Sequence, residues 1–196
     1  MTLALRCRCG QVTGIVATDR AYVRATCYCR DCQAYARHLG QPGLVDAHGG
    51  TDIVAMNPLA VRFTAGEEHI AGLCLRKGGL FRWYAACCRT PLGNTPHDGR
   101  VAYVGMVTAC LMPVAEVDAV FGPPGRIVLN AGSAIGEVRG TPMAFVLGGA
   151  RIAAGILGAR LRQQVPSLFF GPSGQTLRTA YPLSAGERDA VGVQTG

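Results

Sequence analysis

Residues 26–33 read TCYCRDCQ and place Cys27, Cys29 and Cys32 in the pattern CxCxxC. Three thiols this close together can hold a metal ion, form a redox pair or take part in disulfides. Each interpretation requires a different chemical environment. The other cysteines and the composition of the chain are needed to choose between them.

The composition is that of a globular protein. The chain has 196 residues, of which 49% are hydrophobic and 16% charged. Its formal charge of +7 comes almost entirely from arginine, because Lys77 is the only lysine. The arginines are spread along the chain without a basic run, which disfavours nucleic acid as a partner. A positive cleft that attracts a small anionic substrate accounts for the charge equally well.

The opening residues MTLALRCRCG reach polar residues and cysteines before any long apolar stretch, so we expect a cytoplasmic protein rather than a secreted one. In a reducing compartment, nine cysteines serve more readily as metal ligands than as disulfides. Two cysteines one residue apart on an extended strand also project to opposite sides and bridge poorly to one another. This pattern favours metal over a disulfide framework.

Zinc takes thiolates in a tetrahedron, and its ligands usually arrive as closely spaced pairs. Cys7 and Cys9, completed by Cys87 and Cys88, would make a closed structural site. The CxCxxC group supplies three ligands and leaves a fourth position for water, substrate or a distant side chain. The sequence therefore predicts one or two zinc ions per chain.

Two alternatives for the CxCxxC group stay open. It could be a second structural site that takes its fourth ligand from Cys110, His38 or His97. Cys29 and Cys32 could instead form a redox pair, although the sequence shows no sign of the strand–helix setting that such pairs usually have. Other chemistry-bearing residues have structural interpretations. His69 is expected in a strand or turn and Cys74 in the core, while Asp46, His48 and Asp52 are expected in a loop that could edge the pocket. Trp83 and Tyr84 fit a half-buried strand as well as a substrate wall.

The first part of the chain is predicted to be mainly antiparallel β, over residues 1–112. Short runs rich in β-branched and aromatic residues occupy 60–64, 69–75, 80–87 and 100–108. The glycines of RKGG, residues 76–79, predict a tight hairpin turn. The composition changes after Pro113, and we expect residues 113–196 to form a helical extension that begins with a short helix or turn.

Two helices are predicted in this extension. The first is long and apolar, over 142–164, and the second is short and begins at SAGE, residues 184–187, which has the spacing of a capping box. Arg151 near the middle of the long helix, together with its glycines, disfavours membrane insertion. We expect this helix to be buried, with its small residues against its own sheet or against a second subunit in a homodimer.

Three motifs carry a resemblance to a known family. CRCG at 7–10, CYCRDCQ at 27–33 and CRTPL at 88–92 resemble, in order and spacing, the glutathione-dependent formaldehyde-activating enzymes, a family that includes centromere protein V. That family has CxCG, then CHCxxCR/Q, then CxxCGTPL, on an antiparallel zinc-binding fold called a β-tent. The resemblance covers residues 3 to about 108. Its departures are Ala85 for a cysteine, Arg89 for glycine and Tyr28 for histidine, with Cys87 as a displaced substitute.

The resemblance implies a structural zinc at Cys7, Cys9 and Cys88, and an active-site zinc at the CxCxxC group. A thiol such as glutathione would bind this second zinc and add to a small aldehyde, so the implied activity is that of a carbon–sulfur lyase or its reverse. Arg30 and Arg37 lie beside the loop and could pair with the carboxylates of an anionic thiol, or could simply be solvated. The alternative is a non-catalytic, zinc-stabilised module that binds protein or nucleic acid.

Overall fold

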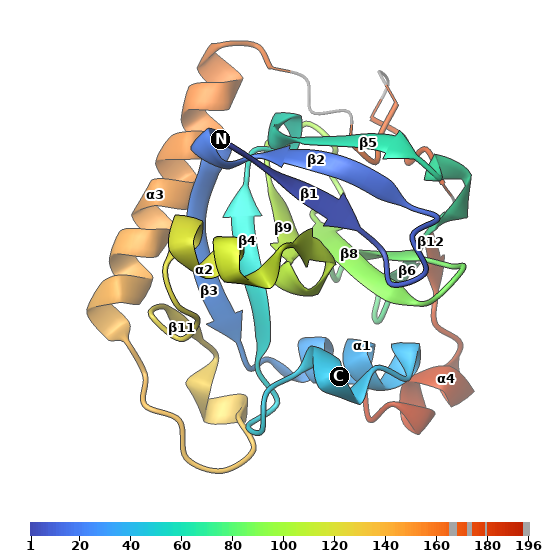
Figure 1. The fold of residues 1–196 in the computed structure, drawn as a ribbon. Helices are drawn as coiled ribbons and strands as arrows, with labels where there is room; N and C mark the ends of the chain where they lie inside the picture. Colours follow the sequence, from blue (N-terminus) through green and yellow to red (C-terminus); the bar gives the residue numbers. More distant parts are fainter. Residues whose placement is uncertain (165–167, 172–173, 179, 194–196) are drawn as a thin grey trace.

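The computed structural model of the chain describes residues 1–164, 168–171, 174–178 and 180–193. Two β-sheets enclose the core, and helices lie along their edges (Figure 1). The smaller sheet is antiparallel and has the order β10-β1-β2-β5. Its strands are β1 (Thr2–Arg6), β2 (Thr13–Ala17), β5 (Val61–Ala65) and β10 (Leu111–Met112).

The larger sheet has eight strands in the order β11-β3-β4-β9-β8-β7-β6-β12. Its central pairings are antiparallel, and the two outermost strands, β11 and β12, pair in parallel with their neighbours. The strands are β3 (Ala21–Cys27), β4 (Thr51–Met56), β6 (Ile70–Cys74), β7 (Phe81–Ala85), β8 (Thr90–Thr95), β9 (Val104–Val107), β11 (Val128–Leu129) and β12 (Ala180–Pro182). The predicted fold class, mainly β with a C-terminal helix, is confirmed.

The four predicted strand runs all contain strands, β5, β6, β7 and β9. The predicted hairpin turn at 76–79 joins β6 to β7, with Cys74 opposite Phe81, and Gly78 there has a φ of +76° that favours glycine. The run expected from Arg100 begins as a strand only at Val104. The residues before it form a turn in which the N–H of Val101 donates to the carbonyl of Asp98.

The segment after residue 112 is built into the same sheets and core. Strand β11 pairs with β3, and β12 pairs with β6. Helix α2 (Val114–Phe121) contributes Val117 to the core between the sheets, and Phe169 stacks there on Trp83 with ring centroids 4.5 Å apart. Trp83 is fully buried by this packing, so it forms part of the core and not a substrate wall.

Two of the remaining helices bear on the sequence predictions. Helix α1 (Arg30–Leu39) was not predicted, and it begins two residues after the end of β3. Helix α4 (Ala185–Ala190) begins with the predicted capping box, in which Ser184 and Glu187 exchange side-chain-to-backbone hydrogen bonds. Tyr35 and Leu39 of α1 pack in a second hydrophobic cluster with Leu73, Val107, Leu183 and Val191. This cluster holds α1 between the larger sheet and the C-terminal segment.

Helix α3 (Pro142–Leu161) runs along one side of the molecule beside β3 (Figure 1). It ends three residues before the predicted boundary. By length and composition it could span a membrane, and only 11% of its most apolar 18-residue window is buried within the protein. The expectation of a buried helix is therefore wrong. The prediction that small residues allow a close approach holds for two glycines, because Gly148 lies against Ile127 and Gly155 against Tyr22, whereas Gly149 meets nothing within 4 Å. Most of the large apolar residues of the helix are exposed to solvent, and Ile152 and Ile156 are half-buried.

Candidate metal centre

The CxCxxC thiols lie where β3 passes into α1. Cys27 ends the strand, Cys29 is the N-cap of the helix, and Cys32 is in its first turn. The Cys29 sulfur accepts a hydrogen bond from the N–H of Cys32 at 3.4 Å. The three Sγ atoms all lie within 4.8 Å of one another. A helix N-terminus favours thiolates, so this position suits metal ligands.

This junction corrects one of the sequence arguments. The strand–helix setting that the redox alternative was expected to lack is present, because α1 follows β3 with two residues between them. The three cysteines of the group are free thiols here. A redox pair uses two sulfurs, whereas the third sulfur, from Cys27, also lies within 4.8 Å of the other two. The geometry therefore suits a shared metal ion better than a pair.

Tyr28 anchors the loop between the first two ligands. Its hydroxyl donates to Asp46 Oδ2 at 2.9 Å, and Asp46 Oδ1 accepts the N–H groups of His48 and Gly50, each at 2.8 Å. Burial alone would raise the pKa of Asp46, but these hydrogen bonds outweigh it and lower the pKa below its usual value. The loop is held by turn chemistry, as expected. Asp52 lies instead on β4, where its carboxylate pairs with Arg24 at 2.6 Å.

A cavity of about 700 Å³ opens onto the three thiols. Its polar lining comes from several distant segments and includes Arg30, Arg76, Arg82, Asn94, Tyr103 and Asn130. Asn130 contacts one of the three clustered cysteines directly, because its Nδ2 lies 3.5 Å from the Cys27 sulfur. The cavity therefore carries three arginines around the sulfurs, and Ile53, Leu80, Leu129 and Val193 add an apolar part to its lining.

Arg82 is the most unusual residue of this lining. It is 4% exposed, and its Nη1 donates to the Cys32 sulfur at 3.4 Å. Its guanidinium lies 5.6 Å from the centre of the Tyr35 ring. Burial would lower the pKa of Arg82, but interaction with Cys32 outweighs burial and raises it. Sequence reasoning missed Arg82, although a charged residue inside the apolar run LFRWYAAC was a usable signal.

The thiols resist joint ionisation on their own. The hydrogen bond with Cys27 is the largest influence on the pKa of Cys32 and raises it, and burial also raises it, whereas the hydrogen bond with Cys29 and the charge of Arg82 lower it; the net shift is upward. Metal ligands must be deprotonated, and a divalent cation supplies the charge that stabilises neighbouring thiolates. One arginine offsets only part of the repulsion among three thiolates. The group fits a dication.

None of the proposed fourth ligands joins this group. Cys110 is fully buried and its thiol donates to the carbonyl of Val107 at 3.1 Å. The ring of His97 faces the carbonyl of Gly79 and lies 3.8 Å from the sulfur of Cys74. Within residues 1–164 and the other described segments, no fourth Cys, His, Asp or Glu completes the cluster. A fourth ligand to a metal held by these three sulfurs would therefore have to come from the cavity, which the three cysteines line.

The second predicted group also forms. Cys7 and Cys9 meet Cys87 and Cys88, with sulfur–sulfur distances of 3.5 Å for Cys7–Cys9, 3.3 Å for Cys9–Cys87 and 3.9 Å for both Cys7–Cys87 and Cys87–Cys88. Tetrahedral zinc with bonds of about 2.3 Å places its sulfurs about 3.8 Å apart. Two of these distances agree with that separation, and the other two, 3.3 and 3.5 Å, are shorter. The adjacent cysteines both reach the cluster, and Arg89 after them takes a φ of 57° as the chain turns.

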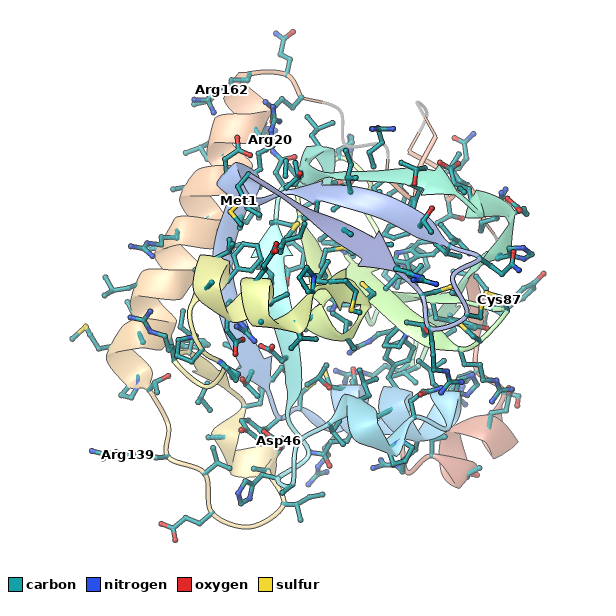
Figure 2. All side chains as sticks on the ribbon, viewed as in Figure 1. Met1, Arg20, Asp46, Cys87, Arg139 and Arg162 are labelled. Carbon is teal, nitrogen blue, oxygen red and sulfur yellow. The ribbon has the colours of Figure 1, made fainter. Side chains whose placement is uncertain are left out.

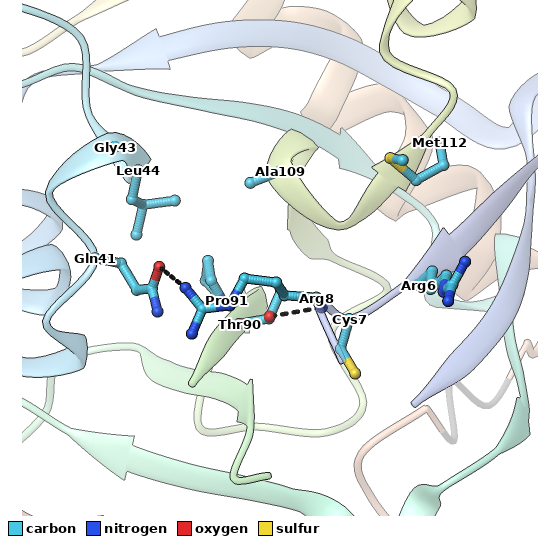
Figure 3. Close-up of a pocket in the computed structure, with 10 residues that line it drawn as sticks. All are labelled: Arg6, Cys7, Arg8, Gln41, Gly43, Leu44, Thr90, Pro91, Ala109 and Met112. Atoms are coloured by element: carbon cyan, nitrogen blue, oxygen red, sulfur yellow. Dashed lines mark hydrogen bonds between the residues drawn. The ribbon is translucent and has the colours of Figure 1, made fainter. Parts of the chain in front are cut away.

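A separate cavity of about 510 Å³ lies beside this four-cysteine cluster (Figure 3). Arg8 crosses it, with its Nη1 3.2 Å from Gln41 Oε1 and its backbone N–H 3.0 Å from Thr90 Oγ1. Of the four clustered cysteines, only Cys7 is in the described lining of this cavity, and Cys7 is buried. The four thiolates would complete a tetrahedron among themselves, so this cavity offers no open metal position.

The two arginines that were predicted to bind substrate, Arg30 and Arg37, lie in different places. Arg30 lines the cavity at the CxCxxC thiols. Arg37, near the other end of α1, donates from Nε and Nη2 to the carbonyl of Val191 at 2.9 and 2.6 Å. It holds the C-terminal segment and is absent from the described cavity lining. Arg76 takes a place there instead, 3.2 Å from Asp31, which also lines the cavity.

Comparison with known proteins adds one assignment. The model of a family of unknown function, DUF6151, matches residues 1–145. The chain belongs to this family. The DUF6151 match contains both cysteine clusters and stops in the first turn of α3. No curated protein matches the chain.

One solved structure is similar in part. It is the crystal structure of a Rhodobacter sphaeroides protein, a structural genomics target, with 18% sequence identity to this DUF6151 chain. The match covers 63% of this chain and 99% of that one, with a TM-score of 0.41.

Proposed function

We propose that this chain is a zinc-dependent carbon–sulfur lyase-like protein that acts on the adduct of an anionic thiol and a small aldehyde. The observation that carries the proposal is the CxCxxC cluster, whose three sulfurs face a cavity lined by arginines. The motif order shared with formaldehyde-activating enzymes supports the same reading. The four-cysteine cluster would hold a second zinc with a structural role.

Zinc bound at Cys27, Cys29 and Cys32 would hold the sulfur of a substrate thiol as a thiolate at neutral pH. In the forward direction the thiol sulfur bonds to the aldehyde carbon, the carbonyl π bond breaks, and the proton lost from sulfur ends on the new hydroxyl. In reverse, the carbon–sulfur bond breaks and the thiol regains a proton. No oxidant or reductant is required.

The chain's own residues would bind and orient the substrate. Arg30 and Arg76 place positive charge at the cavity, where they can pair with the carboxylates of a glutathione-like thiol. Burial raises the pKa of Tyr103 to about 12, so its hydroxyl stays protonated at neutral pH and can donate to the oxygen of the adduct. Arg82 offsets the negative charge that Cys32 carries as a ligand.

The first test is zinc per chain, measured by elemental analysis on protein purified under reducing conditions without chelator. We expect two zinc ions in the wild type and one in Cys29→Ser. Cys74→Ser is the matched control, because Cys74 belongs to neither cluster, and it should keep both ions. Unchanged zinc in Cys29→Ser would contradict a metal at CxCxxC. A Cys29–Cys32 disulfide in zinc-free protein would favour the redox pair.

The second test is turnover, followed by NMR as the rate at which glutathione and formaldehyde exchange with their hydroxymethyl adduct. We expect acceleration by the wild type and its loss in Cys27→Ser. Turnover that survives Cys27→Ser would contradict the proposed site. Two bound zinc ions without any turnover would contradict the enzyme and favour the non-catalytic binding module.

A further inference from the structure

Helix α3 carries an apolar face that the rest of the chain leaves uncovered. Its sheet side includes two glycines in close contact, with Gly148 against Ile127 and Gly155 against Tyr22. On the opposite side lie five large apolar residues, which we call the α3 outer face, and they are Met143, Val146, Leu147, Leu157 and Leu161. Their exposed fractions run from 57% for Leu157 to 76% for Leu161.

Helix geometry places these five side chains in one stripe. At about 100° per residue, all of them lie within about 60° of one direction, which is opposite to Gly148 and Gly155. The helix has 20 residues and is about 30 Å long. An apolar stripe of this length is rare on the surface of an isolated soluble protein, and usually marks an interaction site.

The two charged residues of α3 itself are both arginines, Arg151 and Arg160. By the same geometry, Arg151 and Arg160 lie about 90° to either side of the outer face. Arg139 precedes the helix and Arg162 follows it, at its two ends (Figure 2). All four are exposed, and no acidic side chain of the described segments forms an ion pair with them. The sequence contains no Asp or Glu between residues 138 and 186.

We propose that the α3 outer face docks on an anionic phospholipid bilayer, with the helix lying in the plane of the interface. The apolar stripe would sit at the boundary between headgroups and acyl chains. Arg151 and Arg160, on the flanks, would reach the phosphate level with their guanidinium groups. The sheet side of the helix stays on the protein, so the chain binds one surface of the bilayer and does not cross it.

This placement changes the meaning of Arg151. In a membrane-spanning helix it would lie near the centre of the bilayer, which is why insertion was disfavoured from the sequence. On a helix that lies flat, Arg151 is beside the headgroups and adds attraction to anionic lipid. A second copy of this chain is a poorer occupant, because pairing two outer faces brings together Arg151 and Arg160 of both copies, and no acidic side chain of the described segments forms an ion pair with either residue.

The test is co-sedimentation of the full, reduced chain with vesicles of neutral phosphatidylcholine, or of the same lipid with about one-third phosphatidylglycerol. We expect the partition coefficient to be about tenfold or more higher on the anionic vesicles. Arg151→Gln combined with Arg160→Gln should remove most of that preference. Raised salt should weaken binding, because it screens exposed charges.

Two variants test the apolar part. Leu157→Glu and Met143→Glu each place a carboxylate in the outer face and should lower binding to anionic vesicles at least about tenfold. Tyr181→Glu is the matched control, since Tyr181 is 68% exposed on β12, at the opposite edge of the larger sheet from β3 and α3, and it should leave binding unchanged. Thermal denaturation should show all three variants folded, because each site is exposed.

Three results would overturn the proposal. One is equal binding to neutral and anionic vesicles, and another is undiminished binding by both glutamate variants. The third is absence of vesicle binding together with a doubled mass in sedimentation equilibrium that Leu157→Glu returns to the monomer value, which would assign the outer face to a second copy of the chain.

Discussion

Arg82 shows at the scale of one residue how the fold completes a site. Burying the charge of an arginine without a partner would lower the stability of the fold. Here the guanidinium of Arg82 donates a hydrogen bond to the Cys32 sulfur and lies over the ring of Tyr35. The contact joins β7 to α1 across 50 residues of chain. If Cys32 binds metal as a thiolate, Arg82 stabilises that thiolate and orients its sulfur, as outer partners of metal ligands do.

We expect Arg82→Met to lower zinc affinity at the CxCxxC group about tenfold to hundredfold, because an outer partner of a ligand is lost. The measurement is competition for zinc with a chromophoric chelator. Arg76→Met is the control, since Arg76 lines the same cavity with a side chain that is 63% exposed, and its effect should be much smaller. Equal effects of the two changes would argue against a specific role for Arg82.

Asp46 stabilises the loop that carries Tyr28. Asp46→Asn should lower the free energy of unfolding by about 1–2 kcal/mol at pH 7, because the amide cannot accept all three hydrogen bonds. The folded-state pKa of Asp46 is lowered, so its stabilisation is complete above the unfolded pKa and is lost as the pH falls through the folded value. The gap between wild type and variant should therefore stay constant from pH 8 to pH 6.

Urea denaturation at several pH values measures this gap. Asp98→Asn is the control, because Asp98 pairs with Arg100 on the surface and its loss should matter much less. If the difference in unfolding free energy between wild type and Asp46→Asn shrank between pH 8 and pH 6, Asp46 would ionise in that range, which would contradict its lowered pKa.

At the scale of elements, the seating of α3 depends on where its glycines lie. A Cβ on Gly155 would stand 2.3 Å from Cε1 of Tyr22, and the hydroxyl of Tyr22 is held by the carbonyl of Ala102 at 2.9 Å. A Cβ on Gly149 would meet nothing within 4 Å. The two glycines belong to the same helix, so they share the same gain in helix propensity on change to alanine.

We expect opposite signs from the two substitutions. Gly149→Ala should raise the free energy of unfolding by about 0.5–1 kcal/mol, through helix propensity alone. Gly155→Ala should lower it by about 1–2 kcal/mol, because overpacking against Tyr22 outweighs that gain. Urea denaturation of both variants measures the difference. The same sign in both would mean that α3 does not pack on β3 as described.

At the scale of the whole molecule, the four-cysteine cluster ties the sheets together. Cys7 and Cys9 lie in the turn between β1 and β2 of the smaller sheet, and Cys87 and Cys88 lie in the turn between β7 and β8 of the larger one. Cys9 and Cys87 are 78 residues apart in sequence. A metal ion here would close a long loop, whereas one at CxCxxC links residues of a single short segment.

We therefore expect Cys9→Ser to lower Tm more than Cys29→Ser does, although each removes one zinc. Closing the longer loop restricts the unfolded chain more, so its loss costs more stability. A loss of about 3 kcal/mol would lower Tm by roughly 10 °C for a chain of this size. Calorimetry with zinc analysis on the same samples measures both quantities. An equal or larger fall in Cys29→Ser would contradict the role of the four-cysteine cluster as the tie between sheets.

The amino-acid sequence by itself determined the features that depend on neighbours along the chain. The spacing of the cysteines indicated both clusters, because metal ligands come in close pairs from turns. The glycines at 76–79 predicted the hairpin, and SAGE predicted the start of α4, since both depend on backbone geometry within a few residues.

Only the tertiary structure decided the features that join distant segments. Arg82 reaches Cys32, and Arg37 turns to Val191, because β7 and the C-terminal segment pack on α1. The sequence could not predict the exposure of α3 either. Apolar residues occur on all sides of this helix, so their periodicity did not indicate which side would pack on β3. Small residues allow the close approach to Tyr22, and that packing leaves the large residues on the surface.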